Sequence, residues 1–160
     1  THRAHHLMPA PVTTLAGLFA GLEEIAHGVL DVDLGEKFGT LSIYQARPHQ
    51  ILLPAIWFWL APGITNVADT YVEEDEIYVR AIAGVQHGDS TDQAQRLFKL
   101  ADALRNVLGR ELKNANSPLG GVDARVTGVQ PGEHDFNGTP VLAIEFPIRV
   151  YLKSAHAAQF

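Results

Sequence analysis

Histidine is the residue type in this chain best suited to acid–base or metal chemistry, and the sequence contains eight of them. His2, His5 and His6 cluster at the N-terminus and could bind a transition metal through imidazole. Short histidine tracts are not specific for metal, and nothing around this one predicts a fixed geometry, so we interpret it as a solvated arm. His27 is expected near the end of a helix, where a cation favours the helix dipole.

The other four histidines lie beside turn residues or in the C-terminal tail: His49, His87, His134 and His156. None of them has a carboxylate at the spacing of a catalytic triad or of an H-E-x-x-H zinc site. A general base also needs a partner group within hydrogen-bond reach. We therefore expect no catalytic residue and no metal site, and replacement of His87 or His134 by Ala should not impair assembly.

Carboxylates gather at Glu73, Glu74, Asp75 and Glu76, where oxygen ligands could bind a divalent cation. The run lacks the glycine and the alternating spacing of a calcium loop, so a solvated loop is the better interpretation. We expect residues 69–76 to be exposed, with Glu73→Ala and Glu74→Ala each changing stability by less than ~0.5 kcal/mol. The group formed by Asp31, Asp33 and Glu36 receives the same interpretation.

Trp57 and Trp59 lie two positions apart and share one face of a predicted strand. Such a pair could be a platform on which bases or sugars stack. It could equally belong to a second packed layer or to a subunit interface, where Trp is enriched. No basic residues are interleaved with the pair in the sequence, so we favour core or interface.

Composition excludes several classes of function. The chain has 160 residues, 46% of them hydrophobic, and no cysteine, which rules out disulfides and thiolate chemistry. Its formal net charge is −6 and it has no Lys/Arg-rich run, so the sequence gives no sign of the basic face that grips nucleic acid. Neither a phosphate loop nor a dinucleotide fingerprint is present, and we expect no cofactor.

The longest apolar run, residues 51–61, contains Pro54 and falls short of the ~20 residues of a membrane-spanning helix. We expect no membrane association, no signal peptide at the N-terminus, and a protein assembled in the cytoplasm.

Hydrophobic periodicity predicts two amphipathic helices and several strands. The first helix starts after Thr13 or Thr14, and the second after Ser90 or Thr91. Strands are predicted at residues 40–47, 53–61, 76–85, 122–130 and 140–152, with a hairpin-like connection over 131–138 that contains Asn137-Gly138. In the 76–85 strand, Tyr78 and Arg80 face away from the aliphatic side.

Strands separated by single helices predict an α+β domain with a mixed or antiparallel sheet and two helices packed against it. The predicted organisation is an N-terminal arm over residues 1–12, one domain over 13–153 and a tail over 154–160. The 140–152 strand alternates along its whole length, so it should lie in the middle of the sheet or at a subunit junction.

The order of these segments resembles the tail-terminator, or tail-completion, proteins of long-tailed bacteriophages. An N-terminal helix precedes an apolar strand that begins at Leu53-Pro54-Ala55. An acidic loop, an alternating strand (residues 76–83), a long amphipathic helix and a terminal β-hairpin follow. The match rests on element order and length over about residues 13–152, together with the lack of catalytic signatures.

The resemblance implies a virion protein of the tail or neck that forms a ring, usually of six subunits. Such a ring caps the tail tube, ends its polymerisation and joins it to the head connector, and DNA passes through its lumen without specific binding. The implied partners are other copies of the chain, the tail tube protein and the connector. An acidic lumen would suit DNA passage, because it repels phosphate.

Two surfaces follow as hypotheses. An interface would contain Trp57, Trp59, Tyr78, Arg80, Arg149 and Tyr151, whereas Glu73, Glu74, Asp75 and Glu76 would face the lumen or the tube. A charged residue at Trp57 or Trp59 should then abolish ring closure and spare the fold, whereas an unfolded product would place the pair in the core. The alternatives are a head–tail connector protein, or a small ferredoxin-like enzyme or ligand-binding domain with a pocket near His87 and Trp57.

Overall fold

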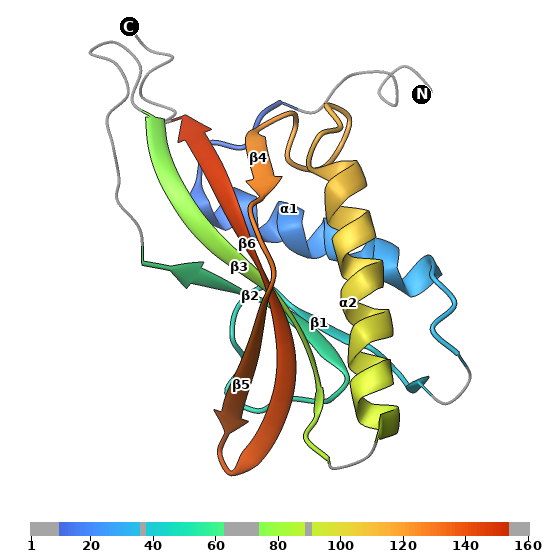
Figure 1. Ribbon diagram of the computed structural model, residues 1–160. Coiled ribbons are helices and arrows are strands. Elements are labelled where there is room, and N and C mark those ends of the chain that lie inside the picture. The colour runs from blue at the N-terminus through green and yellow to red at the C-terminus, as the bar shows by residue number, and fades with distance from the viewer. Residues whose placement is uncertain (1–9, 36–37, 63–73, 89–90, 154–160) are drawn as a thin grey trace, which may run out of the picture.

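The computed structural model describes residues 10–35, 38–62, 74–88 and 91–153. Two α-helices, a 3-10 helix and six strands follow one another in this part of the chain (Figure 1). Their bounds are α1 (Leu15–Ala26), η2 (His27–Asp31), β1 (Ser42–Tyr44), β2 (Ala55–Ala61), β3 (Glu74–Gln86), α2 (Thr91–Glu111), β4 (Asp123–Val126), β5 (Gln130–Phe136) and β6 (Thr139–Lys153). Among the described residues no helix is long and apolar enough to span a membrane.

The first helix begins where its capping residue predicts. Thr14 has an extended backbone, and its hydroxyl accepts a hydrogen bond from the Gly17 N–H at 3.0 Å. Leu18, Leu22 and Ile25 recur at three- and four-residue spacing and are buried. The helix ends at Ala26 with His27 as its C-cap, so His27 lies at the end of the helix as expected, and the chain continues into η2. The second helix starts at Thr91, and Ser90 lies outside the described residues.

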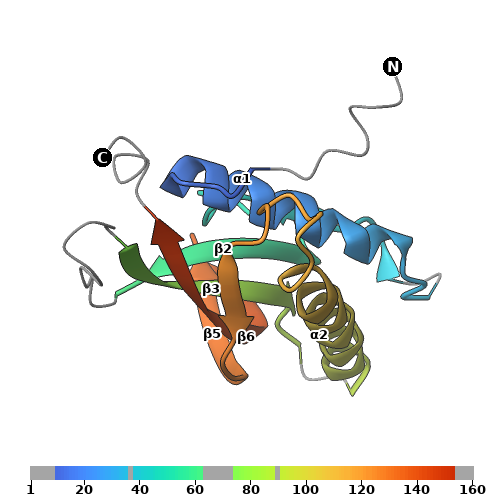
Figure 2. The ribbon, with the colours of Figure 1, turned by 90° about the horizontal axis from the view of Figure 1, so that it is seen from above.

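The strands form one mixed six-stranded sheet, which confirms the predicted α+β fold. The order is β1-β2-β3-β6-β4, and β5 pairs with β6 as well. Only β1 and β2 run parallel; all other pairs are antiparallel. Both helices lie over the same face of the sheet (Figure 2). The long strand β6 lies inside the sheet, as its continuous alternation predicted.

A bulge separates β4 from β5 along the same side of β6. Val126 pairs with Ile148 and Gln130 with Glu145, so three residues oppose two. Pro147 lies at this point, and its carbonyl accepts the Thr127 N–H at 2.8 Å. The backbone N and O atoms of a strand residue point toward the same neighbouring strand. Pro147 has no N–H, and the hydrogen bond that it cannot donate would be at the bulge, where pairing with β4 and β5 is already interrupted.

Several predicted boundaries were wrong. The strand predicted over 122–130 is β4 followed by the bulge, and the one predicted from residue 53 begins at Ala55. The stretch 131–138 is not a loop: residues 130–136 form β5, where Pro131 and Gly132 are tolerated because β5 is an edge strand. Only Asn137 and Gly138 form the turn, with φ of 54° and 87°, as the Asn-Gly pair requires. The first strand is reduced to residues 42–44, and the strand predicted from residue 76 begins at Glu74.

The sheet has a hydrophobic core on each of its faces. The main core packs α1 and α2 on residues such as Phe58, Val79 and Ile148. Val12, which falls in the predicted arm, packs against it, and its N–H donates to the Leu119 carbonyl at 3.2 Å. The smaller core lies on the opposite face, called here the helix-free face, and contains Ala55, Trp57, Ile82, Phe136, Val141 and Ala143.

The smaller core exists because the sheet curls over itself. Trp57 is on β2 and Phe136 on β5, three strands apart, which in a flat sheet is roughly 14 Å. Their ring centroids are nevertheless 5.3 Å apart in an edge-to-face contact. The β5–β6 hairpin therefore folds back over the helix-free face and covers Trp57.

Candidate functional site

The helix-free face brings together all six residues predicted to form an interface. Alternation along each strand puts them on the side opposite the main core, and pairing between strands puts them in adjacent rows. Trp59 pairs with Arg80, Tyr78 with Arg149, and Tyr151 with Glu76. Residues distant in the sequence thus become neighbours on one surface.

Trp57 lies inside this face and not on its surface. It is fully buried, with His134 and Phe136 packed edge-on against it at ring-centroid distances of 5.4 and 5.3 Å. Its surface role at an interface was therefore a wrong prediction, and the core alternative holds for this residue. Its indole Nε1 is buried and has no hydrogen-bond partner among the described residues.

A carboxylate buried in the same face connects three strands. The Glu145 side chain is only 8% exposed; its Oε1 accepts from Arg80 Nη1 at 3.1 Å and its Oε2 from His134 Nε2 at 3.0 Å. Removing a carboxylate from water is costly unless charged and hydrogen-bonding partners compensate. The two bonds supply such partners and fix the orientation of the Arg80 guanidinium.

His134 is held at both ring nitrogens. Arg47 Nη1 lies 3.2 Å from its Nδ1, and Arg47 Nη2 donates to the Asp135 carbonyl at 2.8 Å. Because guanidinium only donates, Nδ1 accepts and the proton is on Nε2, toward Glu145. With both nitrogens engaged, the ring is a link between β5 and β6 and has no free lone pair for general-base chemistry. The prediction that His134 lies in a turn was wrong, because the connection had been drawn too long.

Arginines lie over the aromatic rings of this face. The Arg47 guanidinium carbon is 4.0 Å from the Phe136 ring centroid and 6.0 Å from that of Trp59. Arg149 lies 5.5 Å from the Tyr151 ring. The sequence showed no basic residue beside Trp57 and Trp59, but strand pairing supplies them from other segments. Arg47 was missed, and its only local signal was a position just before Pro48.

The acidic run belongs largely to β3. Residues 74–76 begin this strand, and Asp75 and Glu76 are half-buried, so the prediction of an exposed loop was wrong there. Residues 69–73 lie outside the described part. The Tyr78 hydroxyl donates to Glu76 Oε1 at 2.5 Å. This hydrogen bond, then burial and the charge of Glu76, raise the pKa of Tyr78 above 10.0.

Of the other residues considered for chemistry, His27 is the C-cap of α1 and lies 3.9 Å from Glu23. His49 lies 3.4 Å from the Asn137 amide, in the loop beside the hairpin turn. Within the described ranges no group of three His, Asp or Glu could hold a metal ion. His2, His5, His6 and His156 lie outside those ranges.

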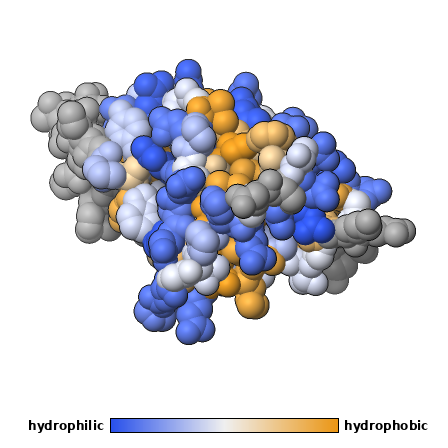
Figure 3. Space-filling view, turned by 60° about the horizontal axis from the view of Figure 1, so that its bottom comes forward, coloured by the Kyte–Doolittle hydropathy of each residue, from blue (hydrophilic) through white to orange (hydrophobic). Residues whose placement is uncertain are grey.

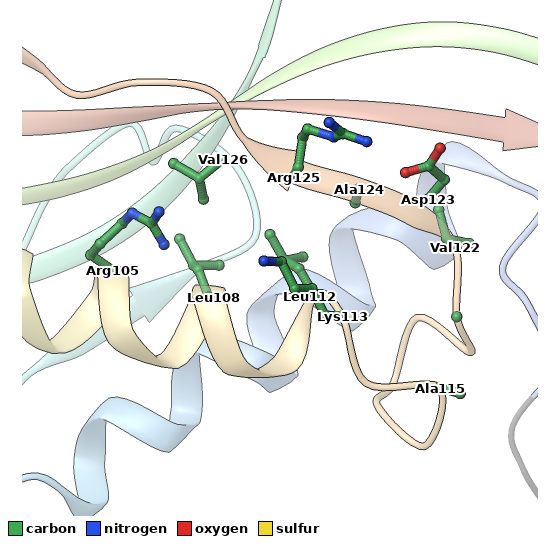
Figure 4. Close-up of a pocket in the computed structure, with 12 residues that line it drawn as sticks. Arg105, Leu108, Leu112, Lys113, Ala115, Val122, Asp123, Ala124, Arg125 and Val126 are labelled. Atoms are coloured by element: carbon green, nitrogen blue, oxygen red, sulfur yellow. The ribbon is translucent and has the colours of Figure 1, made fainter.

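A second surface feature lies between the C-terminal half of α2 and β4 (Figure 4). It is a hollow of about 690 Å³ with Leu108 and Leu112 along its helical wall. In Figure 4 the Arg105 side chain reaches toward Val126 on β4, whereas Asp123 and Arg125 point away from the helix. The hollow is thus bordered by helix α2 on one side and by an edge strand on the other.

Comparison of the sequence with models of known protein families gives no match, and comparison with curated proteins gives no match either. The inference of function therefore rests on the geometry of these two surfaces and on the element order described above.

Proposed function

We propose that this chain is a structural protein of a long-tailed phage virion, and that it forms a ring which caps the tail tube and joins it to the head connector. The observation that carries the proposal is the helix-free face. Trp59, Tyr78, Arg80, Arg149 and Tyr151 lie there on neighbouring strands, and no helix of the described part covers them.

The composition of this face suits contact with another protein. Trp, Tyr and Arg are the residues most enriched among interface positions that dominate binding energy. Trp59 remains 43% exposed, although it is a large apolar side chain. Burying it against a partner would remove apolar area from water at about 25 cal/mol per Å².

The face is also preorganised for contact. Glu145 fixes Arg80, and Arg47 is fixed by His134 and the Asp135 carbonyl. Side chains that are already ordered lose less conformational entropy on binding. Catalysis is less well served by this arrangement, because His134 has no free ring nitrogen and Trp57 is too deeply buried to line an open pocket.

The native mass of the purified chain, measured by light scattering, tests the proposal. We expect a closed assembly of several copies, visible as rings by electron microscopy and bound at the ends of tail tubes. A chain that stays at the mass of one copy, 17.4 kDa, at high concentration and with tail tubes present would contradict it.

A further inference from the structure

We propose that the groove between α2 and β4 binds the exposed segment of residues 30–33 of a second copy of this chain. The inference rests on the proposed ring and deepens it, since it assigns the contact between neighbouring subunits. It moves the subunit contact from the helix-free face, where the sequence analysis put it, to the groove, and it leaves the helix-free face for the tail tube or the connector.

The groove is longer than the hollow of Figure 4. A second hollow, also of about 690 Å³, adjoins the first and shares Arg105 and Val126 with it. Its walls include Phe98 on α2 and Val129 in the bulge after β4, both exposed. In a view with the bottom of the molecule brought forward, apolar surface gathers between hydrophilic margins (Figure 3). Because they share Arg105 and Val126, the hollows together form a groove along α2.

The groove exposes two large apolar side chains, Phe98 and Val129, and two cations outside β4. Arg105 and Lys113 are exposed and form no ion pair within the described residues. Asp102 is the acidic side chain that borders the Phe98 end. An occupant should therefore combine apolar side chains with carboxylates.

The segment that ends η2 has this combination. Leu30 and Val32 are large apolar side chains that are exposed, and they alternate with the exposed Asp31 and Asp33. A partner that covers this segment would remove both apolar side chains from water at once. The two carboxylates complement Arg105 and Lys113, the cations of the groove that do not lie on β4.

A chain cannot place this segment in its own groove. Positions two apart on an α-helix point roughly 200° apart, so Arg105 and Val107 face opposite sides of α2. Arg105 lines the groove, whereas the Val107 side chain lies next to Gly28 of η2. The groove and the 30–33 segment therefore flank α2 on opposite sides. Two unlike patches on opposite sides of one chain produce head-to-tail contacts, which close into a ring when the rotation allows.

Charge reversal at each patch tests the proposal. The groove variant is Arg105→Glu with Lys113→Glu, and the segment variant is Asp31→Lys with Asp33→Lys. Native mass is measured at low ionic strength, where exposed pairs are least screened. We expect each double variant alone to fall to the mass of one chain with an unchanged circular dichroism spectrum.

Complementation provides the decisive arm. In an equal mixture of the two double variants, the acidic groove of the groove variant can bind the basic segment of the segment variant. The unchanged basic groove of the segment variant can bind the unchanged acidic segment of the groove variant, so assembly should return. The quadruple variant should assemble by itself. The matched control is Arg125→Glu, on the strand that borders the groove but with its side chain directed away from α2; it should keep the native mass.

The outcomes separate this inference from the proposed ring. Wild-type rings that persist in both double variants, or that Arg125→Glu disrupts equally, would overturn the inference and leave the ring. Dimers or open chains that break and recombine in the expected pattern would support the inference and refute the ring. A wild-type chain that remains a monomer refutes both. An assembly lost on nuclease treatment would overturn the inference, because nucleic acid and not the 30–33 segment would then join the copies.

Discussion

Trp57 and Trp59 point to the same face of β2, two positions apart, but Trp57 is fully buried and Trp59 is 43% exposed. The difference comes from the β5–β6 hairpin, whose His134 and Phe136 lie against Trp57. Trp59 lies one row farther from the hairpin, where Arg47 and Arg80 are its neighbours. One member of the pair therefore serves the fold, and the other is available for contact.

The two tryptophans should respond differently to substitution. Trp57→Ala should lower the free energy of unfolding by about 3–5 kcal/mol, because it removes a buried aromatic side chain and leaves a cavity. Trp59→Ala should cost under ~1 kcal/mol, since half-exposed residues contribute less. Denaturant titration of both variants measures the difference; equal losses would contradict the assignment of Trp57 to the core.

Trp59→Glu tests the helix-free face directly. The variant should fold, keep its native mass and lose its binding to tail tubes in co-sedimentation, because a charge replaces an apolar contact. A variant that folds but falls to the mass of one chain would place neighbouring subunits on this face and not at the groove.

The buried Glu145 should be energetically coupled to Arg80. Arg80→Ala leaves the carboxylate with one partner fewer and should lower stability by about 2 kcal/mol. Adding Glu145→Gln removes the unpaired charge, so the double variant should lose less than the sum of the two single losses by about 1 kcal/mol or more. Arg110→Ala, at a surface pair with Glu111, is the control and should cost under ~0.5 kcal/mol. If the stability losses of the two single variants add up to that of the double variant, Arg80 and Glu145 act independently.

Tyr78 should titrate later than an ordinary tyrosine. Its pKa is raised chiefly by the hydrogen bond to Glu76, so the folded protein holds the proton more tightly than the unfolded chain. The stabilisation is then present below pH 10.0 and disappears as the pH rises through the higher folded pKa. Ultraviolet difference titration, with Tyr78→Phe to assign the signal, should show the pKa falling toward 10.0 in Glu76→Gln. An unchanged titration in Glu76→Gln would exclude Glu76 as the cause.

Replacing either of two glycines of the β5–β6 hairpin by alanine should lower stability, but for different physical reasons. Gly138→Ala meets no atom within 4 Å but must adopt a φ of 87°, which costs about 1 kcal/mol. Gly132→Ala would bring its Cβ against the Glu145 carboxylate, which Arg80 and His134 hold in place. Its loss, about 2 kcal/mol, should shrink when Glu145→Ala is also present, whereas the loss in Gly138→Ala should not. Thermal or denaturant unfolding of each glycine variant, with and without Glu145→Ala, and of Glu145→Ala alone provides the comparison.

Local patterns were enough to predict the fold class and most of the elements, although not strand β5. Thr14 marks the start of α1, Leu18, Leu22 and Ile25 give its buried side, and the alternation of β3 and β6 predicts the faces of their side chains. These features depend on neighbours within a few residues, so periodicity and capping reveal them. The same alternation put Tyr78, Arg80, Arg149 and Tyr151 on the side away from the aliphatic residues.

Only the tertiary structure decided which of those residues meet and which are covered. The contacts of Glu145 with Arg80 and of His134 with Arg47 join segments 65 and 87 residues apart, and register and curl alone bring them together. A bulge such as the one at residues 127–129 bends its strand, and the Asn137-Gly138 turn pairs β5 back along β6. Burial of Trp57 follows from that geometry, because a side chain's exposure is set by whatever folds over it and not by its own position in a strand.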